Sequence, residues 1–314
     1  MIRVEEDKIL IKTPVIATIG FFDGVHLGHR FLINQLKKEG EKRNLQTMVV
    51  TFIRHPREVL QSDYQPYLLQ TFEERMEALS STNIDYCAPL NFTRELASYS
   101  AERFIKDVLV KNLNVKCLLI GYDHRFGSNR SEGFEDYVRY GKSVGMEVVK
   151  VLPMPFTGAV DTSSSEVRRL LKLGRIVEAN ELLCFPYNIQ GKVVKGERIG
   201  RTLGFPTANI ELGDAHKLLP VKGIYAVEVA MADRTYQGML YIGKRPTLKG
   251  HEVRIEVNIF DYEGDLYGKC LRIFFYSFIR EDKCFENLED LTRQLVRDRE
   301  LTCRYFDTHN IAKR

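Results

Sequence analysis

Two histidines stand three residues apart at the end of the glycine-rich segment Gly20–His29. This segment follows the short apolar run Val15–Ile19, which is typical of a buried strand, and it leads into helix-forming residues. His26 and His29 should therefore share one face of a helical turn. Two imidazoles at that place can donate hydrogen bonds to a phosphate as its charge redistributes. A lone histidine would more often be structural, but this pair in this setting favours phosphate chemistry.

The other residues of the segment suit a phosphate site at a helix start. Gly20 and Gly24 allow the backbone to turn tightly between strand and helix. Gly28 leaves room for a phosphate near the first helical N–H groups, where the helix dipole favours anions. Phe22 and Asp23 lie between these glycines and are expected to line the same nucleotide site.

Two later segments could join this site from neighbouring strands. Gly121–Gly127 directly follows another apolar strand-like run. Thr162–Arg168 carries the spacing Ser163-x-x-Glu166, which is typical of a helix capping box. The same segment has three serines and an arginine one turn into the helix, which also makes it an anion site. Both interpretations can hold together. The nucleotide-binding candidates here are Asp123, Arg125, Ser163, Ser164, Ser165 and Arg168.

A second glycine-rich segment, Gly191–Asn209, differs from the first because basic residues are interleaved with its glycines. It reads either as a mobile phosphate-facing loop or as a polar turn, and it lacks the Gly-Lys-Ser/Thr ending of a P-loop. Thr207 and Asn209 are two apart in an extended stretch, so their side chains face the same way. A hydroxyl and a carboxamide oxygen together can bind a hard cation such as Mg²⁺. The further binding candidates are Gly191, Gly196, Arg198, Gly200, Arg201 and Pro206.

A kinase that acts on an alcohol needs a base to take the hydroxyl proton. Glu256 lies on a strand-like run in which it shares a face with Asn258. If the opposite face is apolar, Glu256 points either into solvent or into a site. For one glutamate on a strand, solvent is the more usual outcome.

The elements that must position these residues fall into two kinds, and the fold class is α/β plus β-barrel. Up to about residue 184, short apolar strands alternate with helices, as in a parallel sheet covered on both faces, and Thr71 with Glu74 forms a capping box. From residue 185, alternating runs rich in Val, Ile, Tyr and Phe predict a closed antiparallel barrel, followed by one helix that Asn287 caps. The predicted strands of the first part are Val15–Gly20, Gln46–Phe52, Ile84–Leu90, Lys116–Gly121 and Glu147–Leu152, and those of the second are Asn188–Lys195, Gly223–Ala230, Tyr236–Ile242, Val253–Tyr262 and Lys269–Phe278.

The composition excludes several classes of protein. The chain has 314 residues, 44% hydrophobic and 28% charged, which is typical of a soluble globular protein with two domains. The apolar runs are too short to cross a membrane, and the charged N-terminus does not resemble a signal peptide. The net charge of +4 does not imply nucleic acid binding. Six scattered cysteines favour reduced thiols over zinc or disulfides, so a cytoplasmic location is expected.

The first part resembles the HxGH-type nucleotidyltransferases, whose fold is Rossmann-like, and among them the bacterial bifunctional riboflavin kinase/FAD synthetases. The resemblance implies that His26 and His29 hold the ATP phosphates and stabilise the transition state. It also implies that Ser163–Arg168 closes on the β- and γ-phosphates, with His55, Asp123 and Arg125 helping to build the site. The matching segments are Gly20–His29, Thr51–Pro56, Gly121–Gly127 and Ser163–Arg168.

Residues from about Tyr187 to Asp298 resemble a riboflavin kinase. This resemblance implies that Thr207 and Asn209 bind Mg²⁺ and ATP, that Glu256 is the base for the riboflavin 5′-hydroxyl, and that Arg280 lines the flavin side. The matching segments are Gly191–Asn209, Leu219–Tyr225, Ile242–Thr247, Ile255–Tyr262, Asp265–Gly268 and Phe278–Arg280.

Together the two resemblances imply a bifunctional enzyme, with ATP as co-substrate for both reactions and no tightly bound prosthetic group. Riboflavin would be phosphorylated to FMN, and FMN adenylylated to FAD with release of pyrophosphate. The small-molecule partners would be riboflavin, FMN and ATP, with neither nucleic acid nor membrane, and a weak homo-oligomer is left open. Two alternatives remain. Only the kinase site could be active, because Ile53 and Arg54 depart from the family pattern, or the chain could be a flavin-sensing protein without turnover.

Overall fold

The computed structural model describes residues 1–4, 11–61, 63, 67–121, 124–128, 132–152, 162–196, 199–231, 234–247 and 250–309. The chain forms two compact units, Met1–Ser164 and Ser165–Arg314. The division of the two enzymatic domains between residues 184 and 185 stays a prediction. Of the candidate site residues, Asp123 and Arg198 lie outside the described residues.

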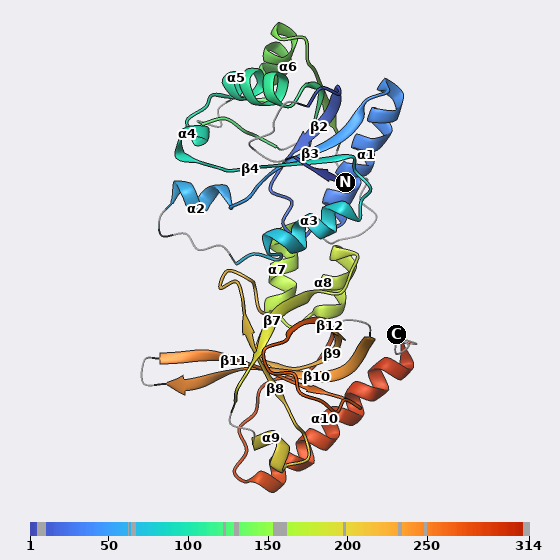
Figure 1. Ribbon diagram of the computed structural model, residues 1–314, viewed down its shortest axis with the longest axis vertical. Helices are drawn as coiled ribbons and strands as arrows, with labels where there is room; N and C mark the ends of the chain where they lie inside the picture. Colours follow the sequence, from blue (N-terminus) through green and yellow to red (C-terminus); the bar gives the residue numbers. More distant parts are fainter. Residues whose placement is uncertain are drawn as a thin grey trace. The chain divides into compact units, whose positions relative to one another are not determined.

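The first unit is built on a six-stranded parallel sheet with the strand order β1-β4-β3-β2-β5-β6 (Figure 1). The central strand β2 lies between β3 and β5, so the chain changes direction across the sheet there. The loops that follow β2 and β5 therefore leave the same carboxyl edge side by side, the usual place for a ligand in such folds. The strands are β1 (Ile2–Arg3), β2 (Val15–Ile19), β3 (Gln46–Phe52), β4 (Tyr86–Leu90), β5 (Val115–Gly121) and β6 (Glu147–Val151).

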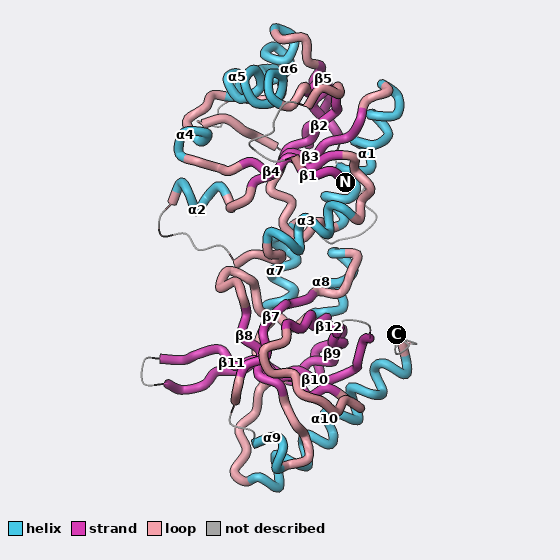
Figure 2. Tube along the Cα trace, in the orientation of Figure 1, coloured by secondary structure: helices cyan, strands magenta, loops and turns pink. Residues whose placement is uncertain are grey.

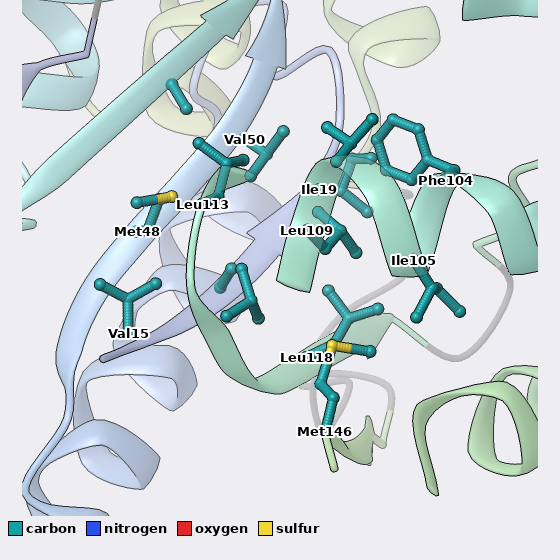
Figure 3. Close-up of a cluster of buried hydrophobic side chains, with 14 of the residues drawn as sticks. Val15, Ile19, Met48, Val50, Phe104, Ile105, Leu109, Leu113, Leu118 and Met146 are labelled. Carbon is teal, nitrogen blue, oxygen red and sulfur yellow. The ribbon is translucent and has the colours of Figure 1, made fainter. Parts of the chain in front are cut away.

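Both faces of this sheet are covered, as predicted. Alternate residues of β2 enter different cores: Val15 and Ile19 pack on one face, and Ile16 packs on the other. The first core includes Phe104 and Leu109 from the π-helix (Figure 3), and the second includes apolar residues of α1 and α3. The helices are α1 (Leu27–Arg43), α2 (Pro56–Leu60), α3 (Phe72–Ser80), α4 (Arg94–Ala97), α5 (Ala101–Arg103), the π-helix (Phe104–Asn112) and α6 (Phe134–Ser143).

The predicted capping box at the start of α3 is confirmed. The Thr71 hydroxyl accepts the Glu74 N–H at 3.3 Å, and the Glu74 carboxylate accepts the Thr71 N–H at 2.8 Å. This reciprocal pair fixes the first turn of α3.

The second unit contains a closed antiparallel barrel with the strand order β10-β11-β8-β7-β12-β9, which confirms the prediction (Figure 2). The strand β10 runs beyond both of its predicted bounds, because a glycine and a proline near its end interrupt its pattern without ending the ladder, whereas β11 both starts and ends three residues earlier than predicted. The strands are β7 (Asn188–Val194), β8 (Ala208–Leu212), β9 (Gly223–Met231), β10 (Arg234–Thr247), β11 (Gly250–Ile259) and β12 (Cys270–Arg280). The helices are α7 (Ser164–Lys172), α8 (Ile176–Leu183), α9 (Ile199–Thr202) and α10 (Leu288–Thr308).

The C-terminal helix α10 lies along the barrel, drawn in red in Figure 1, where it packs on β9, β10 and β12. Its start is capped as predicted, because the Asn287 side chain accepts the Asp290 N–H at 2.9 Å. Leu295 of α10 packs against a cluster that includes Phe205 and Met239. The helix thus closes one face of the barrel wall and bounds a cavity there.

Among the described helices, none has both the length and the apolar character that a membrane crossing requires.

Candidate active sites

The loop between β2 and α1 has an unusual backbone that aims its side chains. Phe22, Gly24 and Val25 have φ angles of 58°, 89° and 39°, in the left-handed region that favours glycine. A side chain at Gly20 would meet the ring of Phe22 at 3.0 Å, so the small residue lets this ring fold back onto the strand end. The loop is held in a shape that an ordinary turn would not adopt.

Asp23 holds this loop to a neighbouring segment. Its carboxylate accepts the N–H groups of Leu69 and Gln70 at 3.0–3.1 Å, and the side-chain oxygen of Gln70 accepts the Gly24 N–H at 3.1 Å. Asp23 is buried. The structure therefore gives Asp23 a positioning role, while direct contact with a nucleotide stays a prediction.

The two histidines predicted to act together do lie together. Their rings stack with centroids 3.7 Å apart and planes 24° apart, and the ring of Phe22 lies 5.0 Å from that of His29 on another side. His26 is the N-cap residue of α1, and His29 lies in the first turn of that helix. This turn contains no acidic residue, so nothing within it offsets the positive end of the helix dipole.

The imidazole of His29 is held in its neutral form. Burial, the nearby imidazole of His26 and the guanidinium of Arg75 lower the pKa of His29 well below its ordinary value. A neutral imidazole carries one N–H, so it can donate one hydrogen bond to a phosphate oxygen without titrating near neutral pH.

The lowered pKa of His29 predicts how stability depends on pH. Between that pKa and about 6.5 the unfolded chain binds a proton that the folded chain does not, so stability rises with pH in this window and is lost as pH falls. We expect the unfolding temperature of wild type to fall more steeply between pH 7 and pH 5 than that of His29→Asn. Parallel curves for the two proteins would contradict the assignment.

Arg75 is a site residue that sequence reasoning missed. Its side chain is 1% exposed and donates to the carbonyl oxygens of Phe52 and Ile53, at the end of β3. Its guanidinium lies 4.0 Å from the ring centroid of Phe21, in the β2–α1 loop, and burial lowers its pKa to about 10. Arg75 thus joins the loops that follow two neighbouring strands. The capping box ahead of it signalled a helix start, but nothing local signalled a buried cation.

The start of the segment Thr162–Arg168 lies against the β2–α1 loop within the first unit. A side chain on Gly28 would come within 2.9 Å of the Thr162 carbonyl oxygen, so glycine is needed for this approach. The Ser164 hydroxyl donates to the carbonyl oxygen of Asp23 at 2.8 Å. The structure therefore brings the first and third segments together, as their chemistry predicted.

The remaining residues of the third segment belong to α7 in the other compact unit, so their approach to the histidines stays a prediction. These are Ser165 and Arg168. Ser163 directly precedes α7, and the Glu166 carboxylate binds Arg169 at 2.7 Å through two nitrogens.

Phe126, in the segment Gly121–Gly127, is held by Tyr137, a residue that the sequence analysis did not identify. The hydroxyl of Tyr137 accepts the Phe126 N–H at 3.0 Å and donates to the carbonyl oxygens of Phe126 and Glu132, each at 3.1 Å. The rings of Phe126 and Tyr137 stack at 4.3 Å. Arg125 next to Phe126 is exposed, and its contact with a nucleotide stays a prediction.

His55 lies after β3 and caps α2. Its Nδ1 accepts the Arg57 N–H at 3.1 Å, and its ring meets that of Phe21 edge-on at 4.7 Å. The predicted nucleotide contact of His55 stays a prediction, but the residue does lie at the carboxyl edge that carries the β2–α1 loop.

The second unit contains a cavity of about 270 Å³ under α10. It brings together Thr207, Glu256 and Arg280, which the sequence placed in one site. Ile255 and Val257, the neighbours of Glu256, are buried on the opposite face of β11. Glu256 therefore faces a cavity rather than open solvent, and its side chain is 15% exposed.

The register of the barrel sets three polar residues in one row. Tyr241 of β10 pairs with Glu256 of β11, and Glu256 pairs with Asn209 of β8. Paired residues on neighbouring strands present their side chains on the same face, with Cβ atoms about 5 Å apart. The predicted base and one predicted cation ligand are thus neighbours, although 47 positions separate them in the chain.

The glycine-rich segment packs directly on the two predicted cation ligands. A side chain at Gly196 would overlap the Asn209 amide, and one at Gly200 would lie 3.3 Å from the Thr207 hydroxyl. The Asn258 amide donates to the carbonyl oxygen of Pro206 at 2.7 Å, which ties this segment to β11. Of the flanking candidates, Pro206 and Arg201 are exposed.

Gly191 and Arg280, two further site candidates, make packing contacts or ion pairs within the second unit. A side chain at Gly191 would meet Ile210 at 2.4 Å, so this glycine permits close packing of β7 on β8. Arg280 donates from Nε and Nη2 to both carboxylate oxygens of Asp298 at 2.7–3.1 Å, and Asp298 is fully buried on α10. Arg280 thus anchors the helix that covers the cavity. Contacts of Gly191 or Arg280 with nucleotide or flavin stay predictions.

Comparisons with known proteins match both parts of the chain. The family model described as FAD synthetase matches residues 8–166, and the one described as riboflavin kinase matches residues 183–306. The chain is 40% identical over 292 residues to the bifunctional riboflavin kinase/FMN adenylyltransferase of Escherichia coli, covering 93% of this chain and 92% of that protein. The protein of the same name from Listeria monocytogenes is 34% identical over 293 residues, covering 93% and 92%.

The fold is also that of a solved structure. A crystal structure described as a macrolide-efflux protein from Streptococcus pneumoniae has a TM-score of 0.87 and 32% sequence identity, covering 96% of this chain and 98% of that one. The agreement extends over both compact units. With both family models matched in order and relatives aligned over nearly the full length, the chain belongs to the family of bifunctional riboflavin kinase/FMN adenylyltransferases.

Proposed function

We propose that this chain makes FMN from riboflavin and ATP in its second unit, and FAD from FMN and ATP in its first. The observation that carries the kinase assignment is that Glu256 and Thr207 line one cavity, while Asn209 pairs with Glu256 across the barrel strands. The observation that carries the adenylyl assignment is the stacked pair of His26 and His29 at an uncompensated helix start.

In the kinase reaction, the protein must orient the riboflavin 5′-hydroxyl and take its proton. Two carboxylates line the cavity among the described residues, Glu256 of β11 and Asp282, which accepts from the Tyr241 hydroxyl, and Glu256 serves as the base. As the proton moves to the carboxylate, the hydroxyl oxygen attacks the γ-phosphorus of ATP and ADP leaves. The apolar part of the lining, which includes Leu291 and Leu295 of α10, suits the isoalloxazine ring and keeps water from the reacting oxygen.

The donors near Glu256 suit Mg²⁺. The Thr207 hydroxyl and the Asn209 amide oxygen are hard oxygen ligands, and Gly196 and Gly200 let the glycine-rich backbone pack closely against them. Two neutral protein ligands fit a cation that keeps most of its contacts with ATP and water. When bound there, Mg²⁺ would neutralise negative charge on the triphosphate.

In the adenylyl reaction no protein nucleophile is required, because the phosphate of FMN is itself an anion that attacks the α-phosphorus of ATP in line. A bond forms between these atoms as the bond to pyrophosphate breaks. His26 and His29 donate to the phosphate oxygens on which charge develops, together with the N–H groups at the start of α1. Arg75 is buried against the β2–α1 loop and supplies positive charge there.

The test is incubation of the full chain with riboflavin, ATP and Mg²⁺, with the products separated over time. We expect FMN to appear first and FAD after it, and excess EDTA to stop both reactions. FMN that accumulates without FAD would support a single active kinase site. Tight binding of FMN without consumption of ATP would support the flavin-sensing alternative, and full activity in EDTA would contradict the metal assignment.

A further inference from the structure

The cationic side chain of Arg254 lies next to Glu256, the proposed base of the kinase site. Arg254 and Glu256 are two apart on β11, so they share a face, and both line the cavity. The Nε of Arg254 donates to Oε1 of Glu256 at 2.6 Å, and Nη2 contacts the same oxygen. Among the described residues, these are the contacts that the Glu256 carboxylate makes.

This ion pair differs from an ordinary surface pair, which would contribute little. Glu256 is 15% exposed and Arg254 is 29% exposed, and both are enclosed by the cavity that α10 covers. Two nitrogens of one planar guanidinium bind one oxygen, so Oε1 is held on the Arg254 side of the carboxylate. Oε1 is occupied by this contact, and Oε2 remains to accept a proton.

The wall around Arg254 limits where its side chain can go. Arg254 pairs across the ladder with Gly243, and a side chain there would overlap the Tyr241 hydroxyl, so the tyrosine fills the space above that glycine. The Tyr241 hydroxyl donates to Asp282 at 3.1 Å. Burial, with the charge of Asp282, raises the pKa of Tyr241 to about 12, so this hydroxyl stays a donor at neutral pH. Arg254 is thus confined between a fixed tyrosine and the base.

We propose that Arg254 is a positioning residue for the kinase reaction, which binds Oε1 of Glu256 so that Oε2 receives the proton of the riboflavin 5′-hydroxyl. This inference rests on the proposed function. In the step, the O–H bond of the alcohol breaks and its proton goes to Oε2. The alcohol oxygen bonds to the γ-phosphorus as the bond from that phosphorus to ADP breaks. Arg254 contacts none of the reacting atoms and acts through Glu256.

The experiment compares full-length wild type with Arg254→Gln, Glu256→Gln and the double variant, measuring kcat and both KM values for FMN formation. We expect Arg254→Gln to lower kcat roughly 10- to 100-fold, the scale of a misplaced catalytic group, with both KM values within about twofold. In the Glu256→Gln background the same change should have no further effect, because the residue acts through the base. The control is Arg234→Gln, which removes an exposed arginine of β10 and should retain the wild-type rate.

Three results would overturn the proposal. These are a wild-type kcat for Arg254→Gln, an equal fold-loss in the Glu256→Gln background, or a wild-type rate for Glu256→Gln itself. The absence of FMN formation by wild type would instead reject the proposed function. If Arg254→Gln folds poorly, Arg254→Lys gives the same test. Lysine keeps the charge but lacks the two-nitrogen fork, so an intermediate kcat is expected, and a wild-type kcat would count against the proposal.

Discussion

We expect replacement of His29 by alanine to abolish FAD formation from FMN and to leave FMN formation from riboflavin nearly unchanged. The expected loss is at least ~100-fold, the scale for removing one preorganised donor to a developing anion. The structure supports so large an effect because the ring is locked between His26 and Phe22, at a helix start without a compensating acid. Solvent could not replace the lost N–H with the same orientation.

The measurement is the initial rate of each reaction, with FMN supplied for the first and riboflavin for the second. A matched control is His309→Ala, which removes an exposed imidazole at the end of α10 and should change neither rate. Equal loss of both activities in His29→Ala would show that the two reactions do not have separate sites. Retention of FAD formation would remove the histidine pair from the adenylyl reaction.

The second large effect is expected for Glu256→Gln, which should reduce FMN formation at least ~100-fold, a typical contribution of a general base. Glutamine keeps the size of the side chain and an oxygen that can still accept from Arg254, so the packing of β11 should be retained. What is lost is the ability to take a proton. FAD formation from supplied FMN in the same protein should stay at the wild-type rate.

The kinetics of Glu256→Gln can distinguish loss of the base from structural damage to β11. Asn258 lies two positions along on the same strand, and its amide ties Pro206 to β11. We would expect damage to that strand to weaken binding of both substrates, whereas loss of the base lowers kcat alone. A Glu256→Gln protein with an unchanged kcat would remove Glu256 from the role of base, and one with raised KM values and an unchanged kcat would make it a binding residue.

Local patterns were sufficient for much of the architecture. The alternation of strands and helices, the capping box at Thr71 and the Asn287 cap depend on residues within a few positions of one another, and the structure contains them all. Strand β8 was predicted only as an extended segment, because its alternating stretch is just five residues long and directly follows a glycine-rich loop. The spacing of His26 and His29 predicted that they share one face at the helix start, and the structure adds that their rings stack.

Contacts between distant parts of the chain could not be predicted from local sequence patterns. Asp23 is predicted to contact a nucleotide, and the structure adds that its carboxylate binds the backbone of Leu69 and Gln70. Arg280 is predicted to line the flavin side, and the structure adds that Asp298 of α10 binds its guanidinium. In both cases the residue type indicated a charge at the site, but the partner came from a segment whose approach no local pattern predicts.

The sequence by itself determined most of the helices and strands and which residues are predicted to carry the chemistry, because helical spacing, strand alternation and caps are properties of near neighbours. Only the tertiary structure decided that Arg75 is buried against the β2–α1 loop. It also decided that Tyr241, Glu256 and Asn209 form one row beside Arg254. Strand register and core packing set these contacts, and both depend on the simultaneous burial of side chains that are far apart in the chain.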